Sequence, residues 1–481
     1  MDKNKLRIST TNHHEPSRTK ERYRTKSSWC LCGSWLIILF ISFPVFAQQD
    51  IEAARRDTIR YGTETEIANL IQALRTENAD YLDDELISLI ENTRNPRILN
   101  GVFGFFGERE KDGLESRAIR AIVERDDENN ETVLSAIEYL GRLNSADAVP
   151  VIRALLDTEE RRFLNSAFRS IGRAASANRE LADETAIFLV DFYKDREPGN
   201  DNRSVVITAI GDTGSSVGVP LLVEIATDPD ERVPLRIAAL GALSKIADED
   251  GLDAILSSIN SSDPNIRSAA VGALGPFSGD VVDSAILEAF RDSFWRTRTA
   301  AAIASRDRKL EAAVPYLRFR AERDEVPGVR DDAIRALGAI ANTEAIEVLD
   351  SLFSEQRNTD RIRILAAEML MKSNGGRDFG KLVVQLHDAR TRNQTNLYNG
   401  FLRVVGETVI EGDTSEMESL TRRFMRDGGL MEKLYALDMA ANNNLRILEE
   451  EIITLSKDRN DSIRRRAYRT AERLGIEIPE E

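Results

Sequence analysis

Apolar and small residues return along this chain at the spacing of a helix face. From about residue 81 onward they recur three, four and seven positions apart, which places them on one side of a helix. The clearest copy is 329–340, Val-Arg-Asp-Asp-Ala-Ile-Arg-Ala-Leu-Gly-Ala-Ile, and 266–275 nearly repeats it. A short turn and a second apolar helix follow each copy. Proline suits the first turn of a helix, and several of these second helices begin at Val-Pro, namely Val149-Pro150, Val219-Pro220 and Val314-Pro315.

An arginine that opens the first helix of each unit marks the period. A fixed period of this length predicts a stacked repeat protein, because one unit cannot bury its apolar face alone. Weaker copies extend the series in both directions, and we expect about eleven or twelve units in one all-α solenoid, with no separate globular domain. The arginines recur every 29 to 34 residues, at Arg203, Arg236, Arg267, Arg296, Arg330 and Arg363.

The repeated phrase resembles a known family. Asp…Val-Arg-x-x-Ala-x-x-Ala-Leu-Gly, followed by Ala-Val-Pro-x-Leu, is similar to HEAT repeats and is closest to the bacterial subtype also seen in phycobilisome lyases. The resemblance covers about 81–475 and is clearest over 203–340. It implies an armadillo-type superhelix of helix–turn–helix repeats whose Arg-led helices line the concave side. It says little about function, because such arrays serve mostly as interaction surfaces.

Acidic residues six positions before the opening arginine form a second regularity. The resemblance implies that these acids and arginines make a ladder between adjacent repeats. Arginine suits such a structural role, because its planar group makes several hydrogen bonds at once. A row of anion-binding arginines is the alternative interpretation. The predicted ladder comprises Arg203, Asp230, Arg236, Arg267, Asp324, Arg330, Asp458 and Arg464, and Glu197 is the acid that precedes Arg203.

The N-terminus has a different composition. Residues 1–28 carry a net charge of +5, and 29–46 are mostly apolar. A basic region, an apolar stretch and a final Val-Phe-Ala predict a secretory signal peptide, cleaved after Ala47 to leave Gln48 first. An uncleaved membrane anchor is the alternative, since the apolar stretch is only slightly short for a span. The predicted organisation is a basic region and signal peptide at 1–47, a leader helix or cap at 48–80 and the solenoid at 81–481.

Net charge and cysteine content limit the possible cellular location of the protein and the classes of partner that it can bind. The whole chain has a net charge of −16. Residues 1–47 contain eight basic and three acidic residues, so the predicted mature chain has a net charge of −21. This disfavours nucleic acid, whose binding depends on phosphate neutralisation, and favours a basic protein or peptide. Both cysteines, Cys30 and Cys32, lie in the leader. We expect an exported protein of the bacterial periplasm or cell envelope, or a secreted one if the cell has a single membrane.

The search for catalytic chemistry finds little. The predicted mature chain has one histidine, His387, and no thiol. It contains no nucleophile elbow, phosphate loop, zinc-binding helix or EF-hand sequence. The glycine-rich run 101–107 superficially resembles a nucleotide loop, but it follows no strand. We interpret Phe103, Phe105 and Phe106 as core residues, and we predict no catalytic residue, no metal and no cofactor.

The Arg-led helices offer a candidate partner surface. Their exposed positions predict a central strip of small residues with charged residues on one side. A shallow strip accommodates an extended peptide or a helix better than a small molecule, which needs a deep pocket. The alternative is that Gly241 and Gly272 only allow close helix packing. The candidate partner-binding residues are Asp331, Asp332, Arg335, Ser268, Gly272 and Gly241.

These observations favour an exported, non-catalytic scaffold or adaptor that binds a protein or peptide on the concave face. One alternative is a lyase-like HEAT-repeat enzyme or a binder of a tetrapyrrole or another small ligand. A second alternative is a structural envelope protein that contacts the membrane only through an uncleaved leader. The sequence leaves the identity of the partner and the oligomeric state open.

Overall fold

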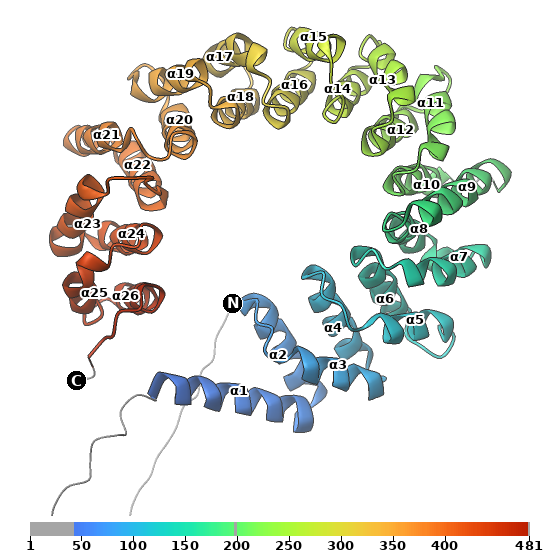
Figure 1. Cartoon of the computed structure of the whole chain (residues 1–481), viewed down its shortest axis with the longest axis horizontal. Helices are drawn as coiled ribbons and strands as arrows, with labels where there is room; N and C mark the ends of the chain where they lie inside the picture. Colours follow the sequence, from blue (N-terminus) through green and yellow to red (C-terminus); the bar gives the residue numbers. More distant parts are fainter. Residues whose placement is uncertain (1–42, 197–199, 480–481) are drawn as a thin grey trace, which may run out of the picture.

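A computed structural model describes residues 43–196 and 200–479, and every regular element within those ranges is a helix. Twenty-six α-helices follow one another in pairs, so that one helix of each pair lies on the inside of a curved array and the other on the outside (Figure 1). The predicted all-α solenoid is therefore confirmed. Helices α3 to α26 form twelve pairs within 81–481, which agrees with the expected eleven or twelve units.

The even-numbered helices line the inside of the array (Figure 1). Successive members of this row pack against each other, so the row forms one continuous inner wall. The inner helices are α2 (Glu64–Glu77), α4 (Pro96–Glu108), α6 (Asn130–Arg142), α8 (Arg161–Ala175), α10 (Asn200–Asp212), α12 (Val233–Ile246), α14 (Pro264–Ala273), α16 (Trp295–Asp307), α18 (Pro327–Ile340), α20 (Asp360–Ser373), α22 (Thr395–Glu407), α24 (Leu430–Asn442) and α26 (Asp461–Leu474).

The odd-numbered helices form the outer row and are often introduced by one turn of 3-10 helix. The outer helices are α1 (Phe43–Tyr61), α3 (Asp83–Asn92), α5 (Glu115–Val123), α7 (Val149–Asp157), α9 (Arg179–Asp195), α11 (Val219–Thr227), α13 (Leu252–Ser258), α15 (Asp280–Ala289), α17 (Val314–Arg323), α19 (Thr343–Ser354), α21 (Phe379–Thr391), α23 (Ser415–Asp427) and α25 (Glu449–Leu455). The 3-10 turns are η1 (Ala146–Ala148), η2 (Ser216–Gly218), η3 (Glu249–Gly251), η4 (Glu311–Ala313) and η5 (Arg446–Leu448).

Proline and short polar side chains mark where helices begin. Helices α7, α11 and α17 start at the predicted Val-Pro pairs, with the proline in the first turn. On the inner row, α14 begins at Pro264, and the Asp263 side chain accepts hydrogen bonds from the Asn265 and Ile266 N–H groups. Such a cap satisfies N–H groups that have no partner inside the helix. Local sequence signals therefore set the start of both helix types.

One hydrophobic core runs along the whole array, from Ile59 to Ile476. Because each pair contributes to it and packs on the next pair, residues 43–196 and 200–479 form no separate globular core. The three phenylalanines of the 101–107 run are buried in α4 and belong to this core. Their interpretation as core residues is confirmed.

Glycines near the ends of inner helices bring neighbouring inner helices into backbone contact. A Cβ atom added at Gly172 would lie 2.3 Å from the Ala209 carbonyl oxygen, and one at Gly211 would lie 2.6 Å from Ala242 Cα. No side chain fits at such distances, so these glycines are required by the packing of α8, α10 and α12. They account for the frequent glycine near the end of the repeated phrase.

The predicted leader lies almost entirely outside the described residues. Helix α1 begins at Phe43, so the backbone of Ala47 and Gln48 lies within its first turns. Among the described helices, none combines the length and the apolar character that a membrane crossing requires. Cleavage after Ala47 remains a prediction, and so does the alternative of an uncleaved anchor.

Candidate partner-binding surface

The inner wall carries a strip of small, uncharged residues across α12, α14 and α16. Gly241, Gly272 and Ile303 occupy equivalent positions on these helices and are exposed. A partly buried alanine lies three residues before each of them. We call this surface the open strip, and it consists of Ala238, Gly241, Ala269, Gly272, Ala300 and Ile303.

Packing does not explain the two glycines of the open strip. A Cβ atom added at Gly241 or Gly272 would meet no atom within 4 Å. Glycine inside a helix costs about 1 kcal/mol relative to alanine, and neither residue gives a close helix contact in return. The alternative interpretation, in which these glycines serve helix packing, is therefore wrong. They keep the backbone of α12 and α14 open to the inside of the array.

The predicted charged residues beside the strip are less exposed than expected or are already paired. Asp331 was expected to be exposed, but it is only 6% exposed and forms an ion pair with Arg361, which lies at the start of α20. Asp331 lies on the side of α18 that faces the next repeat, where the Arg361 side chain covers it. Asp332 receives a 3.1 Å hydrogen bond from Arg335, and the Arg335 side chain is 45% exposed. Ser268 is partly buried on α14.

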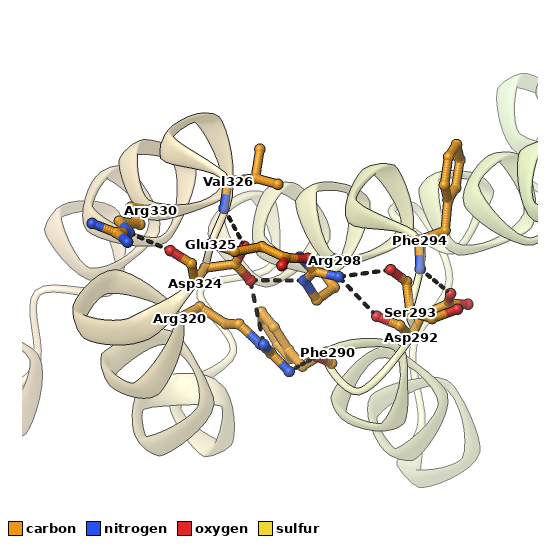
Figure 2. A network of polar contacts seen from close by, with 10 residues as sticks. All are labelled: Phe290, Asp292, Ser293, Phe294, Arg298, Arg320, Asp324, Glu325, Val326 and Arg330. Atoms are coloured by element: carbon orange, nitrogen blue, oxygen red, sulfur yellow. Dashed lines mark hydrogen bonds and ion pairs between the residues drawn. The ribbon is translucent and has the colours of Figure 1, made fainter.

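Arginines and acids link adjacent repeats at the edge where outer helices lead into inner ones. Figure 2 shows the Arg298 guanidinium between two such loops. It donates to both carboxylate oxygens of Asp324, at 2.7 and 2.8 Å, and to the carbonyl oxygens of Asp292 and Ser293, both at 3.0 Å. Both charged side chains are almost fully buried. One arginine thus ties its own loop to the loop of the following repeat.

The same link recurs along the array. Arg267 donates to both oxygens of Asp292, at 2.7 and 3.0 Å, and Arg203 donates to Glu231 at 3.1 Å. Near the C-terminus, Lys433 takes the place of the arginine and donates to Asp458 at 2.9 Å. In each case the basic residue belongs to one inner helix and the acid to the loop before the next inner helix.

The predicted pairing within the ladder needs correction. The acid that lies six residues before an arginine accepts a hydrogen bond from that arginine through its main-chain carbonyl oxygen. The carboxylate of the same acid binds a basic side chain of the preceding repeat. Arg330 donates to the Asp324 carbonyl oxygen, and Arg464 donates to that of Asp458 at 2.9 Å (Figure 2 for Arg330). A spacing of six residues in a tight loop brings the guanidinium to the backbone, not to the side chain.

One acid of the predicted ladder and one of the predicted opening arginines are replaced by other residues. Asp230 is exposed, and Arg236 instead donates to the Ala226 carbonyl oxygen at 3.1 Å. The acid that serves this repeat is the next residue, Glu231. Similarly, the residue that opens α16 in the repeat register is Arg298 and not Arg296. Arg298 also gives more even spacings to its neighbours, and this signal was present in the sequence. Glu197 lies outside the described residues.

Comparison with known proteins agrees with this geometry. The family model described as Spirochaete HEAT repeat protein matches residues 59–470, which is most of the chain. The chain belongs to this family. The helix pairs of the array are therefore HEAT repeats.

This HEAT repeat protein is similar to one curated bacterial protein in sequence and to solved structures of Kap121p and importin beta in fold. It is 26% identical over 186 residues to the uncharacterized phycocyanin operon protein Z of Pseudanabaena tenuis, a match that covers 37% of this chain and 88% of that protein. Among solved structures, Kap121p bound to Pho4p is similar with a TM-score of 0.44 and 12% identity, covering 88% of this chain and 53% of Kap121p. Importin beta gives a TM-score of 0.40 at 12% identity, covering 89% of this chain and 70% of importin beta. The chain spans about half the length of Kap121p.

The described part of this HEAT repeat protein offers little for small-ligand chemistry. It contains no group of three or more His, Cys, Asp or Glu residues placed to hold a metal ion. One hollow beside Tyr398 and Glu432 has a volume of about 170 Å³, and another beside Arg153 and Glu184 about 290 Å³, both below the roughly 300–1,000 Å³ of typical ligand pockets. The first hollow contains Glu432, which already accepts hydrogen bonds from Tyr398 and Arg390. His387 is exposed on α21.

The ladder makes the stability of the protein depend on pH. Burial works to raise the pKa of the Asp324 carboxyl, but hydrogen bonds from Arg298 and from the Val326 N–H, together with the nearby arginine charges, outweigh it and lower this pKa. Hydrogen bonds from Arg267 lower the pKa of Asp292. A carboxyl with a lowered pKa in the folded state stabilises that state above its unfolded-state pKa, and this stabilisation is lost as pH falls through the folded-state value.

We therefore expect the free energy of unfolding to fall below about pH 4, the unfolded-state pKa of aspartate. Urea titrations between pH 7 and pH 3 will measure it. The variant Asp324→Asn, which cannot ionise at this position, should be less stable at pH 7 but should lose less stability on acidification. Parallel pH profiles for the two proteins would contradict the role given to Asp324.

Proposed function

We propose that this HEAT repeat protein is an exported, non-catalytic scaffold that binds a protein or peptide segment along the open strip. The observation that carries the proposal is the unfilled space over Gly241 and Gly272. These glycines lie inside helices, where glycine is unfavourable, and no neighbouring helix uses the space that they leave. A partner backbone or helix placed there would approach the inner wall closely.

The shape of the surface supports a polymer as the ligand. The strip crosses three repeats, carries no charged side chain, and its residues line neither the hollow beside Tyr398 nor the hollow beside Arg153. Peptides that bind as an extended chain or as a helix use shallow surfaces of this kind. The small hollows favour a scaffold over the alternative of a tetrapyrrole-binding or lyase-like protein.

Export is part of the proposal and rests on the sequence of 1–47. The basic region, the apolar stretch and the Val-Phe-Ala end have the order of a secretory signal. The mass of the protein isolated from its own cells tests it directly. A chain that begins at Gln48 supports export with cleavage, whereas an intact leader favours the anchored envelope protein.

A blocking substitution tests the binding surface. The variant Gly272→Trp places a large side chain over the strip, and the open space means that it should leave the fold intact. We expect the recovery of partners by affinity capture from the native cells to fall at least about tenfold, which corresponds to about 1.4 kcal/mol. The matched control is Val384→Trp at an exposed position of outer helix α21. Equal recovery with both variants would contradict the proposal.

A further inference from the structure

We infer that the segment bound on the inner wall is acidic at the end that lies over α6 and α8. This inference rests on the proposed function and deepens it, because it specifies the chemistry and the direction of the partner. It departs from the expectation of a basic partner, which came from the net charge of the chain. The charge of the inner wall itself differs from that net charge.

Three arginines on the inner wall have no ion-pair partner among residues 43–196 and 200–479. Arg142, at the end of α6, and Arg169 and Arg173, on α8, are exposed. They take part in none of the ion pairs and side-chain hydrogen bonds of the described residues, although the chain has a surplus of acidic residues. We call these three residues the arginine patch. One exposed acid, Glu138, lies on the same side of α6 and leaves the patch with a net positive charge.

The packing of α6 on α8 brings the patch together. A Cβ atom at Gly141 would lie 2.5 Å from Ser170 Cβ, so the two helices touch at these residues. Arg142 directly follows Gly141, and Arg169 directly precedes Ser170. Arg173 lies one helical turn beyond Arg169, on the same side of α8. The three guanidinium groups therefore start from adjoining turns of two neighbouring inner helices.

The inner wall beyond the open strip differs from the arginine patch, because several of its acids are already paired with basic residues of the protein. Asp331 pairs with Arg361, Glu368 with Lys372 and Arg403, and Asp438 with Arg466. A basic partner would have to displace these pairs. An acidic segment meets unpaired arginines over α6 and α8 without displacing any, and charge complementarity of this kind sets the orientation of a partner.

The distance from the patch to the strip sets the spacing within the partner. Neighbouring packed helices lie about 8–10 Å apart, and an extended chain advances about 3.3 Å per residue. An extended segment therefore crosses one inner helix about every three residues. From α8 to α12 it needs about six residues. The partner should carry acidic residues, then about six uncharged residues, then small apolar residues that lie on the open strip.

Three synthetic peptides test this inference on the purified full chain. They share a neutral spacer of about six residues and an Ala-Leu-Ala-Leu end, and they begin with Glu-Asp-Glu, Gln-Asn-Gln or Lys-Lys-Lys. Fluorescence anisotropy at low salt measures the binding of each. We expect the acidic peptide to bind at least about tenfold more tightly than the other two, and its affinity to fall as salt is added, because exposed charges are screened. Equal binding of the three peptides, or no binding of the acidic one, overturns the inference.

Charge-reversal variants locate the effect. The triple variant Arg142→Glu/Arg169→Glu/Arg173→Glu should remove the preference for the acidic peptide. The control is Arg179→Glu/Arg377→Glu/Arg459→Glu, which changes the net charge equally at three exposed arginines that also have no ion pair in the described residues. Loss of the preference in both variants would show an effect of net charge alone and would overturn the site.

Two further outcomes separate this inference from the proposed function. If all three peptides bind equally and Gly272→Trp abolishes the binding of each, the inner wall binds peptides but the assignment of an acidic partner is wrong. If a single-stranded oligonucleotide of twelve thymidines binds the arginine patch more tightly than the acidic peptide, the partner is a nucleic acid and the inference is likewise wrong. Tighter binding of the acidic peptide supports it.

Discussion

Replacing Arg298 with methionine will lower the free energy of unfolding by about 3–5 kcal/mol, the range for breaking one side of a buried ion pair. The Arg298 side chain is 5% exposed and that of Asp324 is 0% exposed. Methionine fills part of the space but leaves the buried Asp324 carboxylate with Arg320, at 3.3 Å, as its remaining basic partner and with the Val326 N–H as a hydrogen-bond donor. It also removes the hydrogen bonds to the Asp292 and Ser293 carbonyl oxygens, so two loops lose their common partner.

The damage should be local as well as large. Each repeat of a solenoid contacts only its neighbours, so the loss falls mainly on α16 and α18. Hydrogen exchange should therefore quicken in these helices and change little in α4 and α6. Urea unfolding measures the global effect, and Arg335→Met is the control, since exposed pairs contribute about 0–1 kcal/mol. A loss for Arg298→Met no larger than for Arg335→Met would contradict the structural role of the ladder.

A second variant checks that the buried charge is the cause. In Arg298→Met/Asp324→Asn the remaining side chain is neutral, and it can still accept the hydrogen bond from the Val326 N–H. Much of the cost of the single substitution comes from the uncompensated carboxylate. The double variant should therefore be more stable than Arg298→Met alone. If it is less stable, loss of packing dominates over loss of charge pairing.

Alanine at two glycines of the inner wall will have opposite effects. Gly211→Ala will destabilise the protein by about 1–3 kcal/mol, the usual cost of overpacking, because its Cβ would lie 2.6 Å from Ala242 Cα. Gly241→Ala will stabilise the protein by about 0.5–1 kcal/mol, because alanine is the better helix former and its Cβ meets no neighbour. Both residues lie on inner helices, but Gly211 follows Arg203 by eight residues and Gly241 follows Arg236 by five, so they occupy different positions in the repeat.

Thermal and urea unfolding of the two variants measure this contrast, with Gly272→Ala as a second open position and Gly172→Ala as a second closed one. The free energy of unfolding should rise with alanine at Gly241 and Gly272, which have free space, and should fall with alanine at Gly211 and Gly172, which contact a neighbouring backbone. Destabilisation by Gly241→Ala similar to that by Gly211→Ala would mean that the space over Gly241 is not free. It would then remove the observation on which the proposed function rests.

The sequence predicted the fold well because a repeat is a redundant signal. Each unit repeats a similar apolar spacing, and several also share the Val-Pro start, so a weak signal in one unit is compensated by the others. The position of the opening arginine within each repeat was harder to predict. Arg296 and Arg298 both precede small residues at helical spacing. The more even spacing of Arg298 from Arg267 and Arg330 favours Arg298, and its hydrogen bonds to Asp324 show that it forms the link.

The candidate surface was harder to predict, because its properties depend on the neighbouring repeat. The periodicity of α18 places Asp331 beside exposed residues, but the side chain that buries it comes from Arg361, thirty residues later. Gly211 and Gly241 both lie inside inner helices, but Gly211 follows its opening arginine by eight residues and Gly241 by five. They differ because a backbone approaches one of them and not the other. Sequence patterns predict which residues share a helix face. The contacts between repeats depend on how the array curves, so the sequence pattern alone does not predict them.

Photo-crosslinking from the open strip tests the central claim most directly. A photoreactive amino acid replaces Ile303, an exposed residue of the strip, and in a matched protein it replaces Val384 on outer helix α21. In the native cells, the first protein should form a covalent adduct with one reproducible partner, and the second should not. The adduct should disappear when Gly272→Trp is added. The same adducts from both positions, or an adduct from Ile303 that persists in the Gly272→Trp background, would contradict binding along the inner wall.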